Sequence, residues 1–266
     1  MSTKGGKMSL FLSDNFSKVT KSLSNQGFSK TIALIGMNVM HLIRLHADGR
    51  FDRIHGTDTS GVIVLDGLEI AGPNRGNGEY FIATGTKIFN SLLAQLEIQY
   101  ENFVFIDFGS GKGRNLLLAS HYPFRKIIGV EFSPEFHHCA ESNIALYHPA
   151  GQRCFSIESI CTDAVEFDIP IEPCVLYFFH PFDEVIFGVV LRKVSESLAK
   201  MDRPVVLVYY DPVKPYVIEQ HSFSRFKRIA KVPFDISNPP SDRHAIIYSN
   251  RPLKGFNTSN QQREGK

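Results

Sequence analysis

The stretch that decides the fold is FVFIDFGSGKGRNLLLAS, residues 103–120. It begins with a short apolar run ending near Asp107, continues through Gly109, Gly111 and Gly113, and then becomes an apolar segment with helical spacing. Glycines at alternate positions permit positive φ angles and let the backbone approach a ligand closely. The stretch therefore predicts a buried strand, a glycine loop and a helix whose first unpaired N–H groups face whatever binds there.

Short apolar runs alternate with helical segments around this loop. Strands are expected at 103–108, 126–132, 156–161, 174–179 and 204–210, and helices at 84–96, 114–121, 134–147 and 184–200. This alternation predicts right-handed crossovers and a parallel sheet covered on both faces. Two late runs, 226–232 and 244–249, add an antiparallel edge pair. The expected fold class is α/β, with a doubly wound, mostly parallel, seven-stranded Rossmann-like sheet.

The rest of the chain divides by composition. Residues 1–79 are expected to form an N-terminal extension of helix and loops, with one helix over 31–46. Residues 80–250 form the main domain, and 251–266 a flexible tail. We expect the extension to cover the ligand crevice and to shape the neighbouring site for a substrate.

Within the extension, FDRIHGTDTSG (residues 51–61) is rich in turn-forming and polar residues, among them Asp52, His55, Asp58 and Thr59. Loops of this composition often carry specificity. A plain capping loop is the alternative for each residue taken singly.

Bulk composition limits the possible functions. The formal net charge of +2 over 266 residues is too small to predict a nucleic-acid or membrane partner. The four cysteines lie far apart and form no CxxC pair, so neither disulfides nor a metal site is expected, and a reducing compartment such as the cytoplasm is the default. No stretch reaches the ~18 apolar residues that a membrane span needs.

Three classes of ligand use glycine loops of this general kind. A phosphate-binding P-loop requires GxxxxGK[ST], and Ile106 and Gly113 occupy two positions where that motif needs other residues. A dinucleotide fingerprint requires a small residue where Arg114 stands, since a bulky side chain there would prevent close packing of helix and strand. The third pattern, DxGxGxG, is matched in full from Asp107 to Gly113. A glycine turn without a ligand is the remaining alternative.

Two further acids follow the next predicted strands. Glu131 lies 24 residues after Asp107, where a strand-end carboxylate beside the ligand crevice can accept both ribose hydroxyls. Asp163 follows the third strand, where a carboxylate can accept the adenine amino group. Taken singly, Glu131 could be a solvated strand end and Asp163 a turn residue or helix cap. Acids at the ends of three successive strands favour one shared site.

With these residues in place, the chain resembles the class I S-adenosylmethionine-dependent methyltransferases. FIDFGSGKGR, IIGVEFSPE and VLYFFHPF are similar to segments of a bacterial methyltransferase family, and the glycine loop with a GVE-type second strand gives a looser similarity to the non-SET lysine methyltransferases. The resemblance extends from Tyr80 to about Tyr210. It implies S-adenosylmethionine as the cofactor.

The resemblance also implies roles for individual residues. Asp107 and the backbone of Gly109, Gly111 and Gly113 would surround the methionine part of the cofactor. Glu131 would hold the ribose, Phe132 would flank the adenine and Asp163 would bind its amino group. Tyr80 would close over the cofactor as an aromatic lid, with a packing residue as the alternative.

The fourth predicted strand ends in YFFHPFD, residues 177–183. Methyltransferases that act on planar amino groups carry [DNS]PP[YFW] here, so His180 and the single proline put methylation of nucleic-acid bases in doubt without excluding it. In the functional interpretation Phe182 forms a wall of the acceptor site, and His180 is a hydrogen-bonding group or a base near neutral pH. In the alternative, His180 is a strand-end residue and Asp183 caps the next helix.

The sequence thus predicts methyl transfer from S-adenosylmethionine to an acceptor, with a protein side chain or small molecule favoured over nucleic acid. A module that binds the cofactor without turnover is the second hypothesis. A nicotinamide oxidoreductase is disfavoured by Arg114.

Overall fold

The computed structural model describes residues 49–60, 62–64, 80–82, 84–179, 183–220, 225–233 and 244–253. The chain divides into two compact units, Met1–Arg50 and Phe51–Lys266, and the elements named below all belong to the second. The helix predicted over 31–46 lies outside the described residues, as does the predicted tail beyond residue 253.

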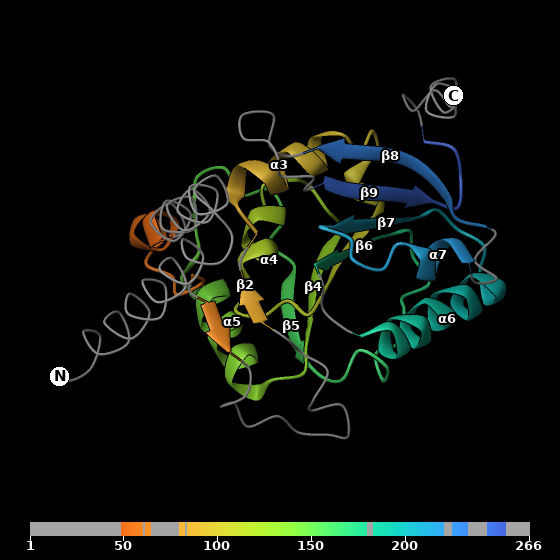
Figure 1. Ribbon diagram of the computed structural model, residues 1–266. Coiled ribbons are helices and arrows are strands. Elements are labelled where there is room, and N and C mark those ends of the chain that lie inside the picture. The colour runs from red at the N-terminus through yellow and green to blue at the C-terminus, as the bar shows by residue number, and fades with distance from the viewer. Residues whose placement is uncertain are drawn as a thin grey trace, which may run out of the picture. The chain divides into compact units, whose positions relative to one another are not determined.

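One large sheet with helices between its strands makes up most of the second unit (Figure 1). Its strands are β3 (Val104–Phe108), β4 (Lys126–Glu131), β5 (Ile157–Cys161), β6 (Cys174–Phe179), β7 (Val205–Tyr210), β8 (Lys227–Pro233) and β9 (His244–Ser249). The helices are α3 (Thr86–Ala94), the 3-10 turn η2 (Tyr100–Asn102), α4 (Arg114–Ala119), α5 (Pro134–Leu146), α6 (Glu184–Lys200) and α7 (Tyr216–Gln220). β1 (Val62–Val64) and β2 (Tyr80–Ile82) form a separate antiparallel pair. The predicted strands and helices of the sheet region end within two residues of these bounds.

The strand order in the large sheet is β5-β4-β3-β6-β7-β9-β8. All neighbouring strands are parallel except at β9, which runs antiparallel to both β7 and β8. This confirms the predicted seven-stranded, mostly parallel, doubly wound sheet of the methyltransferase type. The chain moves outward from β3 to β5 and then returns to the other side of β3, so the strand order reverses at β3. Open α/β sheets bind ligands outside the carboxyl ends of the strands at such a reversal.

Two hydrophobic layers cover the two faces of the sheet, and β3 contributes to both. Val104, Ile106 and Phe108 pack in the layer that includes residues of α6 and α7. Phe105 packs in the layer that includes residues of α3 and α4. Because side chains alternate along a strand, Asp107 is directed to the same face as Phe105, at the end nearest the glycine loop.

Some local structure differs from the prediction. Residues 51–55 are helical, although this stretch was expected to be turns, and α7 and β2 were not predicted at all. The helical turn ends at Gly56, which has a φ of 69°, and the N–H of Thr57 donates to the carbonyl of Asp52 at 3.1 Å. This is the Schellman arrangement, in which a glycine of positive φ lets the N–H of the following residue donate to a terminal carbonyl of the helix. Glycine and polar residues here end a short helix instead of excluding one.

Within the described part of the chain, no helix is long and apolar enough to cross a membrane.

Candidate functional site

The glycine loop joins β3 to α4 and takes the conformation that its sequence predicts. Gly109, Gly111 and Gly113 have φ values of 74°, 54° and 84°, which L side chains rarely adopt. A Cβ atom at Gly113 would lie only 3.1 Å from the Cβ of Ala140 on α5. The loop therefore needs glycine both for its backbone angles and for the close approach of α5.

Amide groups of this loop are engaged within the protein. The N–H groups of Gly109 and Ser110 both donate to the carbonyl of Val130, at 2.9 and 3.2 Å. The N–H of Gly111 donates to Oε2 of Glu131 at 2.7 Å. A phosphate cradle requires such amides to point at the ligand. The loop is thus held by β4, and these three amides are not arranged to bind phosphate.

Gly129, in the middle of β4, was not singled out from the sequence. A Cβ atom there would lie 2.6 Å from Oγ of Ser110 and 2.7 Å from Cδ1 of Leu116. A glycine inside a strand of bulky apolar residues often marks such a close backbone approach. That signal was present in KIIGVE, residues 126–131. Gly129 therefore lets the glycine loop lie directly against the sheet.

Asp107 is buried at the end of β3, with 2% of its surface exposed. Burial raises the pKa of its carboxyl to about 8; the hydrogen bond from Asn115 Nδ2 at 3.1 Å lowers it, and the nearby charge of Glu131 raises it further. Asn115 lies in the first turn of α4, and its Oδ1 atom is buried without a hydrogen-bond partner among the described residues. Asp107 and Asn115 thus place buried polar oxygens at the carboxyl end of the parallel strands.

Glu131 is likewise buried, at the end of β4, although a solvated strand-end acid was one alternative. Burial raises the pKa of its carboxyl to about 7, against the lowering effect of backbone hydrogen bonds from Ser133 and Gly111. The Ser133 N–H lies 2.9 Å from Oε1. No lysine, arginine or histidine in the described ranges forms an ion pair with Glu131 or with Asp107. The two acids form a buried, electrostatically coupled pair.

Phe132 and Asp163, which were also assigned to the cofactor, follow the ends of β4 and β5 at the same edge of the sheet. Asp163 follows β5, and its Oδ1 accepts the N–H of Val165 at 3.1 Å, as a turn-capping aspartate does. The adjacent Thr162 donates its N–H to the carbonyl of Glu131 at 3.0 Å, which ties this turn to β4. Phe132 is half-buried immediately after β4. Asp163 thus has a local structural contact, and its role toward adenine stays a prediction.

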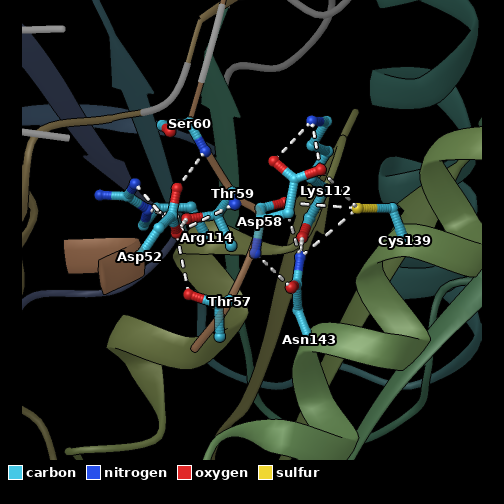
Figure 2. A network of polar contacts seen from close by, with 9 residues as sticks. All are labelled: Asp52, Thr57, Asp58, Thr59, Ser60, Lys112, Arg114, Cys139 and Asn143. Carbon is cyan, nitrogen blue, oxygen red and sulfur yellow. Dashed lines mark hydrogen bonds and ion pairs between the residues drawn. The ribbon is translucent and has the colours of Figure 1, made fainter. Parts of the chain in front are cut away.

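The cations of the glycine loop face a different partner, the segment 51–60, which we call the docking segment (Figure 2). Arg114 is buried, and its Nη2 lies 3.6 Å from Oδ1 of Asp52. Its Nε donates to Oγ1 of Thr59, and its guanidinium lies 4.2 Å from the ring centroid of Phe51. The bulky residue that breaks the dinucleotide pattern therefore serves to hold the docking segment.

Asp52 accepts several hydrogen bonds from its own segment. Its Oδ1 accepts the hydroxyls of Thr57 at 2.8 Å and Thr59 at 2.7 Å, and the Thr59 N–H at 3.0 Å. Its Oδ2 accepts the Ser60 N–H at 2.8 Å. Burial would raise the pKa of Asp52, but the hydrogen bonds from Ser60, Thr59 and Thr57 outweigh it and leave the pKa below its ordinary value. Asp52 and Thr59 are thus partners inside a folded loop.

Asn143 of α5 connects the docking segment to the glycine loop (Figure 2). Its Nδ2 donates to the carbonyls of Asp58 and Lys112, each at 2.9 Å, and its Oδ1 accepts the Asp58 N–H at 2.8 Å. The Lys112 ammonium pairs with the Asp58 carboxylate at 2.9 Å. No sequence pattern marks Asn143, because a single asparagine in a polar helix is ordinary.

The acceptor region was predicted at the end of β6, and the structure describes part of it. Tyr177 is buried, and its hydroxyl lies 3.1 Å from Oγ1 of Thr84 just before α3. Tyr177 also pairs with Asp107 in the sheet register, which places a strand of the acceptor region directly beside the acid pair. At the next strand pair, the Phe179 ring lies 4.4 Å from that of Tyr210.

The side chains of three predicted site residues are not among those that the structure describes. His180 and Phe182 lie outside the described residues, so their roles stay predictions. The backbone of Tyr80 begins β2, opposite Val64, but its side chain is not among those described. Asp183 does cap α6, since its Oδ1 accepts the N–H of Ile186 at 2.9 Å.

The sequence matches no protein-family model and no curated protein. Solved structures with a similar chain course include an RNA methyltransferase from Salinibacter ruber in complex with S-adenosyl-L-homocysteine, at 16% identity and TM-score 0.43, covering 66% of this chain and 99% of that one. A glycopeptide N-methyltransferase complexed with sinefungin has 13% identity and TM-score 0.49, covering 65% and 96%. Magnesium protoporphyrin IX methyltransferase from Synechocystis PCC 6803 with bound S-adenosylmethionine has 12% identity and TM-score 0.43, covering 62% and 77%. Likenesses of this size concern the fold alone.

Proposed function

We propose that this chain is an S-adenosylmethionine-dependent methyltransferase. The observation that carries the proposal is the buried acid pair at the end of β3 and β4. Asp107 and Glu131 have pKa values raised to about 8 and about 7, and neither has a cationic partner in the described part of the chain. Lys112 and Arg114 of the same loop are paired with Asp58 and Asp52.

This distribution of charge favours a ligand that brings donors and positive charge instead of phosphate. S-adenosylmethionine carries a ribose diol, an ammonium group and a sulfonium centre. Glu131 has acceptor capacity left on both oxygens beyond the backbone bonds from Gly111 and Ser133, which suits the diol. Asp107 would lie beside the methionine part. Phe132 would flank the adenine ring.

The opposite case, a phosphate-bearing ligand such as NAD or ATP, fits these residues poorly. The amides of Gly109, Ser110 and Gly111 donate to the protein, and burying a phosphate beside two acids would be repulsive. The remaining proposed contact is from Asp163 to the adenine amino group. Asp163 follows β5 directly after Thr162, whose N–H donates to the backbone carbonyl of Glu131.

When bound, the cofactor supplies an activated methyl group, so the protein's tasks are alignment, exclusion of water and, where needed, removal of a proton. We place the acceptor at the end of β6, because this strand lies next to β3 in the sheet. There His180 would orient or deprotonate the acceptor and Phe182 would form one wall. Tyr80 would act as a lid over the cofactor.

A protein side chain or a small molecule is the favoured acceptor, since the net charge is only +2 and the sequence HPF, residues 180–182, departs from the pattern for planar amino groups. The alternative function is a cofactor-binding module without turnover. It shares the acid pair, so only the acceptor region distinguishes the two.

The test is incubation of the purified protein with methyl-labelled S-adenosylmethionine and fractions of a cell lysate. We expect label in the protein or small-molecule fraction, and much less of it with the His180→Ala and Phe182→Ala variants at equal protein concentration. Loss of a catalytic base typically slows a reaction by about a hundredfold or more. Both variants should keep their affinity for S-adenosylhomocysteine, because the cofactor is held by β3 and β4. Cofactor binding with no labelled fraction would leave the binding module as the function.

A further inference from the structure

A cluster of potential metal ligands lies on the first half of α5, separate from the acid pair. One ligand atom from each of His137, His138 and Glu141 lies within 4.8 Å of the others. The residues are spaced i, i+1 and i+4, so the first and last share a helix face. The cysteine pattern, on which the sequence-based expectation of no metal depended, gives no information about such a site.

The distances within the cluster are close to those of a coordination shell. Nε2 of His137 and Nδ1 of His138 each lie 3.4 Å from Oε2 of Glu141. This separation is that of a long hydrogen bond or an ion pair. It is close to the edge of about 3.3 Å in a tetrahedron whose metal–ligand bonds measure ~2.0–2.1 Å. Side-chain rotations that shorten the longest separation, which is at most 4.8 Å, would place an ion between the three atoms.

A hydrogen bond with a residue of the sheet orients the ring of His137. Its Nδ1 lies 2.9 Å from Oγ of Ser159 on β5, and its Nε2 faces Glu141. When Nδ1–H donates to the serine, Nε2 is the unprotonated nitrogen with a lone pair directed at the cluster. Metal-binding histidines almost always hold the second ring nitrogen in this way.

The exposure of the cluster matches that of a surface ion site. The His137 side chain is 13% exposed, whereas those of His138 and Glu141 are 75% and 56% exposed. One ligand is therefore anchored, and the other two are accessible from solvent, so an ion can enter without unfolding of the helix.

We infer that His137, His138 and Glu141 bind a divalent late first-row transition-metal ion, with Zn²⁺ as the representative. Two imidazoles and one carboxylate are donors that suit Zn²⁺, Ni²⁺ or Cu²⁺ better than Mg²⁺ or Ca²⁺, which prefer all-oxygen ligands. Three protein ligands leave a further coordination position for water. The proposed ion site shares no residue with the proposed cofactor site.

The experiment is a calorimetric titration of the full-length, chelator-treated protein with Zn²⁺, without cofactor. Wild type should bind one equivalent at this site, and His138→Ala or Glu141→Gln should weaken binding at least tenfold. The matched control is His148→Ala, which removes another exposed histidine just beyond α5 and should leave the affinity unchanged.

A second variant tests the anchoring of His137 without removing a ligand. Ser159→Ala should weaken Zn²⁺ binding by about 10–100-fold, the usual effect of losing a partner of a metal-binding histidine. Because His138 and Glu141 are exposed, their variants should keep the wild-type circular dichroism and melting temperature in the absence of metal. Absence of zinc binding to wild type, or equal affinity in wild type and His138→Ala, would overturn the inference while leaving the proposed methyltransferase function intact.

Discussion

The two sides of the glycine loop differ in how their buried charged groups are paired. On the side of the docking segment, Arg114 and Asp52 are buried together, and Asp52 accepts hydrogen bonds from three residues of its own segment. On the side of the sheet, Asp107 and Glu131 are both buried, and the charge of Glu131 makes the carboxyl of Asp107 harder to ionise. Arg114 and Asp52 thus form an ion pair within the protein, whereas Asp107 and Glu131 have no cationic partner among the described residues.

This difference separates residues that build the site from residues that bind in it. A buried charge is costly unless it is paired and hydrogen-bonded. Where the pairing is internal, as for Arg114, substitution should affect stability. Where a buried acid has no cationic partner, as for Glu131, substitution should affect ligand affinity.

The largest expected effect is on stability in Arg114→Ala. The substitution leaves the buried Asp52 carboxylate without its cation, and breaking a buried ion pair from one side costs about 3 kcal/mol or more. Urea unfolding followed by circular dichroism measures it. Lys112→Ala is the matched control, because its partner Asp58 is 70% exposed and an exposed pair contributes about 1 kcal/mol or less. Equal losses in the two variants would show that burial of the pair does not matter.

The second effect concerns Gly129, where the glycine loop rests on β4. In Gly129→Ala the new Cβ would meet Ser110 Oγ at 2.6 Å, and overpacking of this kind costs about 1–3 kcal/mol. Gly188 in α6 is the matched control, since a Cβ there has no neighbour within 4 Å. Gly188→Ala should stabilise the protein by about 0.5–1 kcal/mol, the usual gain in a helix interior. A stable Gly129→Ala would contradict the close approach of loop and strand.

The third prediction concerns ligand affinity in Glu131→Gln. Glutamine keeps an oxygen that can accept one backbone N–H but loses the charge and an acceptor for the diol. Affinity for S-adenosylhomocysteine should fall about tenfold or more, equivalent to about 1.4 kcal/mol. Glu135→Gln, an exposed glutamate in the first turn of α5, should bind as wild type does. Unchanged affinity in Glu131→Gln would remove this residue from the cofactor site.

A smaller effect is expected in the pH dependence of stability without ligand. The pKa of Asp107 is raised to about 8 in the folded state, so the folded protein holds a proton that the unfolded chain has lost. Its contribution to stability is present at low pH and is lost as the pH rises through 8. Between pH 7 and 8.5 the wild type should lose about 1 kcal/mol more than Asp107→Asn does. A wild type that gains stability relative to the variant would contradict the burial of this acid.

Asp52 should behave with the opposite sign. Its pKa is lowered in the folded state, so its contribution is present above the ordinary pKa of about 4 and is lost as the pH falls below it. Urea unfolding of wild type and Asp52→Asn between pH 5 and 3 checks this. A variant that loses as much stability over this range as the wild type would contradict the lowered pKa.

The predictable and unpredictable parts of the molecule differ in the range of their interactions. The strands, the helices between them and the glycine loop follow from local patterns, since alternation, glycine spacing and N-caps such as Asp183 are written in neighbouring residues. The contacts of Asn143 and the ion pair of Arg114 with Asp52 join residues that lie 31 to 85 positions apart in the sequence. Such residues meet only in the folded chain, so local patterns do not reveal these contacts. The burial of Glu131 was likewise not visible, because a strand-end acid has the same local sequence whether solvated or enclosed.

The central claim is that the acid side of the glycine loop binds S-adenosylmethionine. Calorimetric titration with S-adenosylhomocysteine at pH 7, in buffers of different ionisation enthalpy, tests it most directly. The hydroxyl and ammonium donors should hold Asp107 and Glu131 ionised, so we predict binding with release of protons to the buffer and no binding of NAD or ATP. Tight binding of NAD or ATP without binding of S-adenosylhomocysteine would contradict the claim.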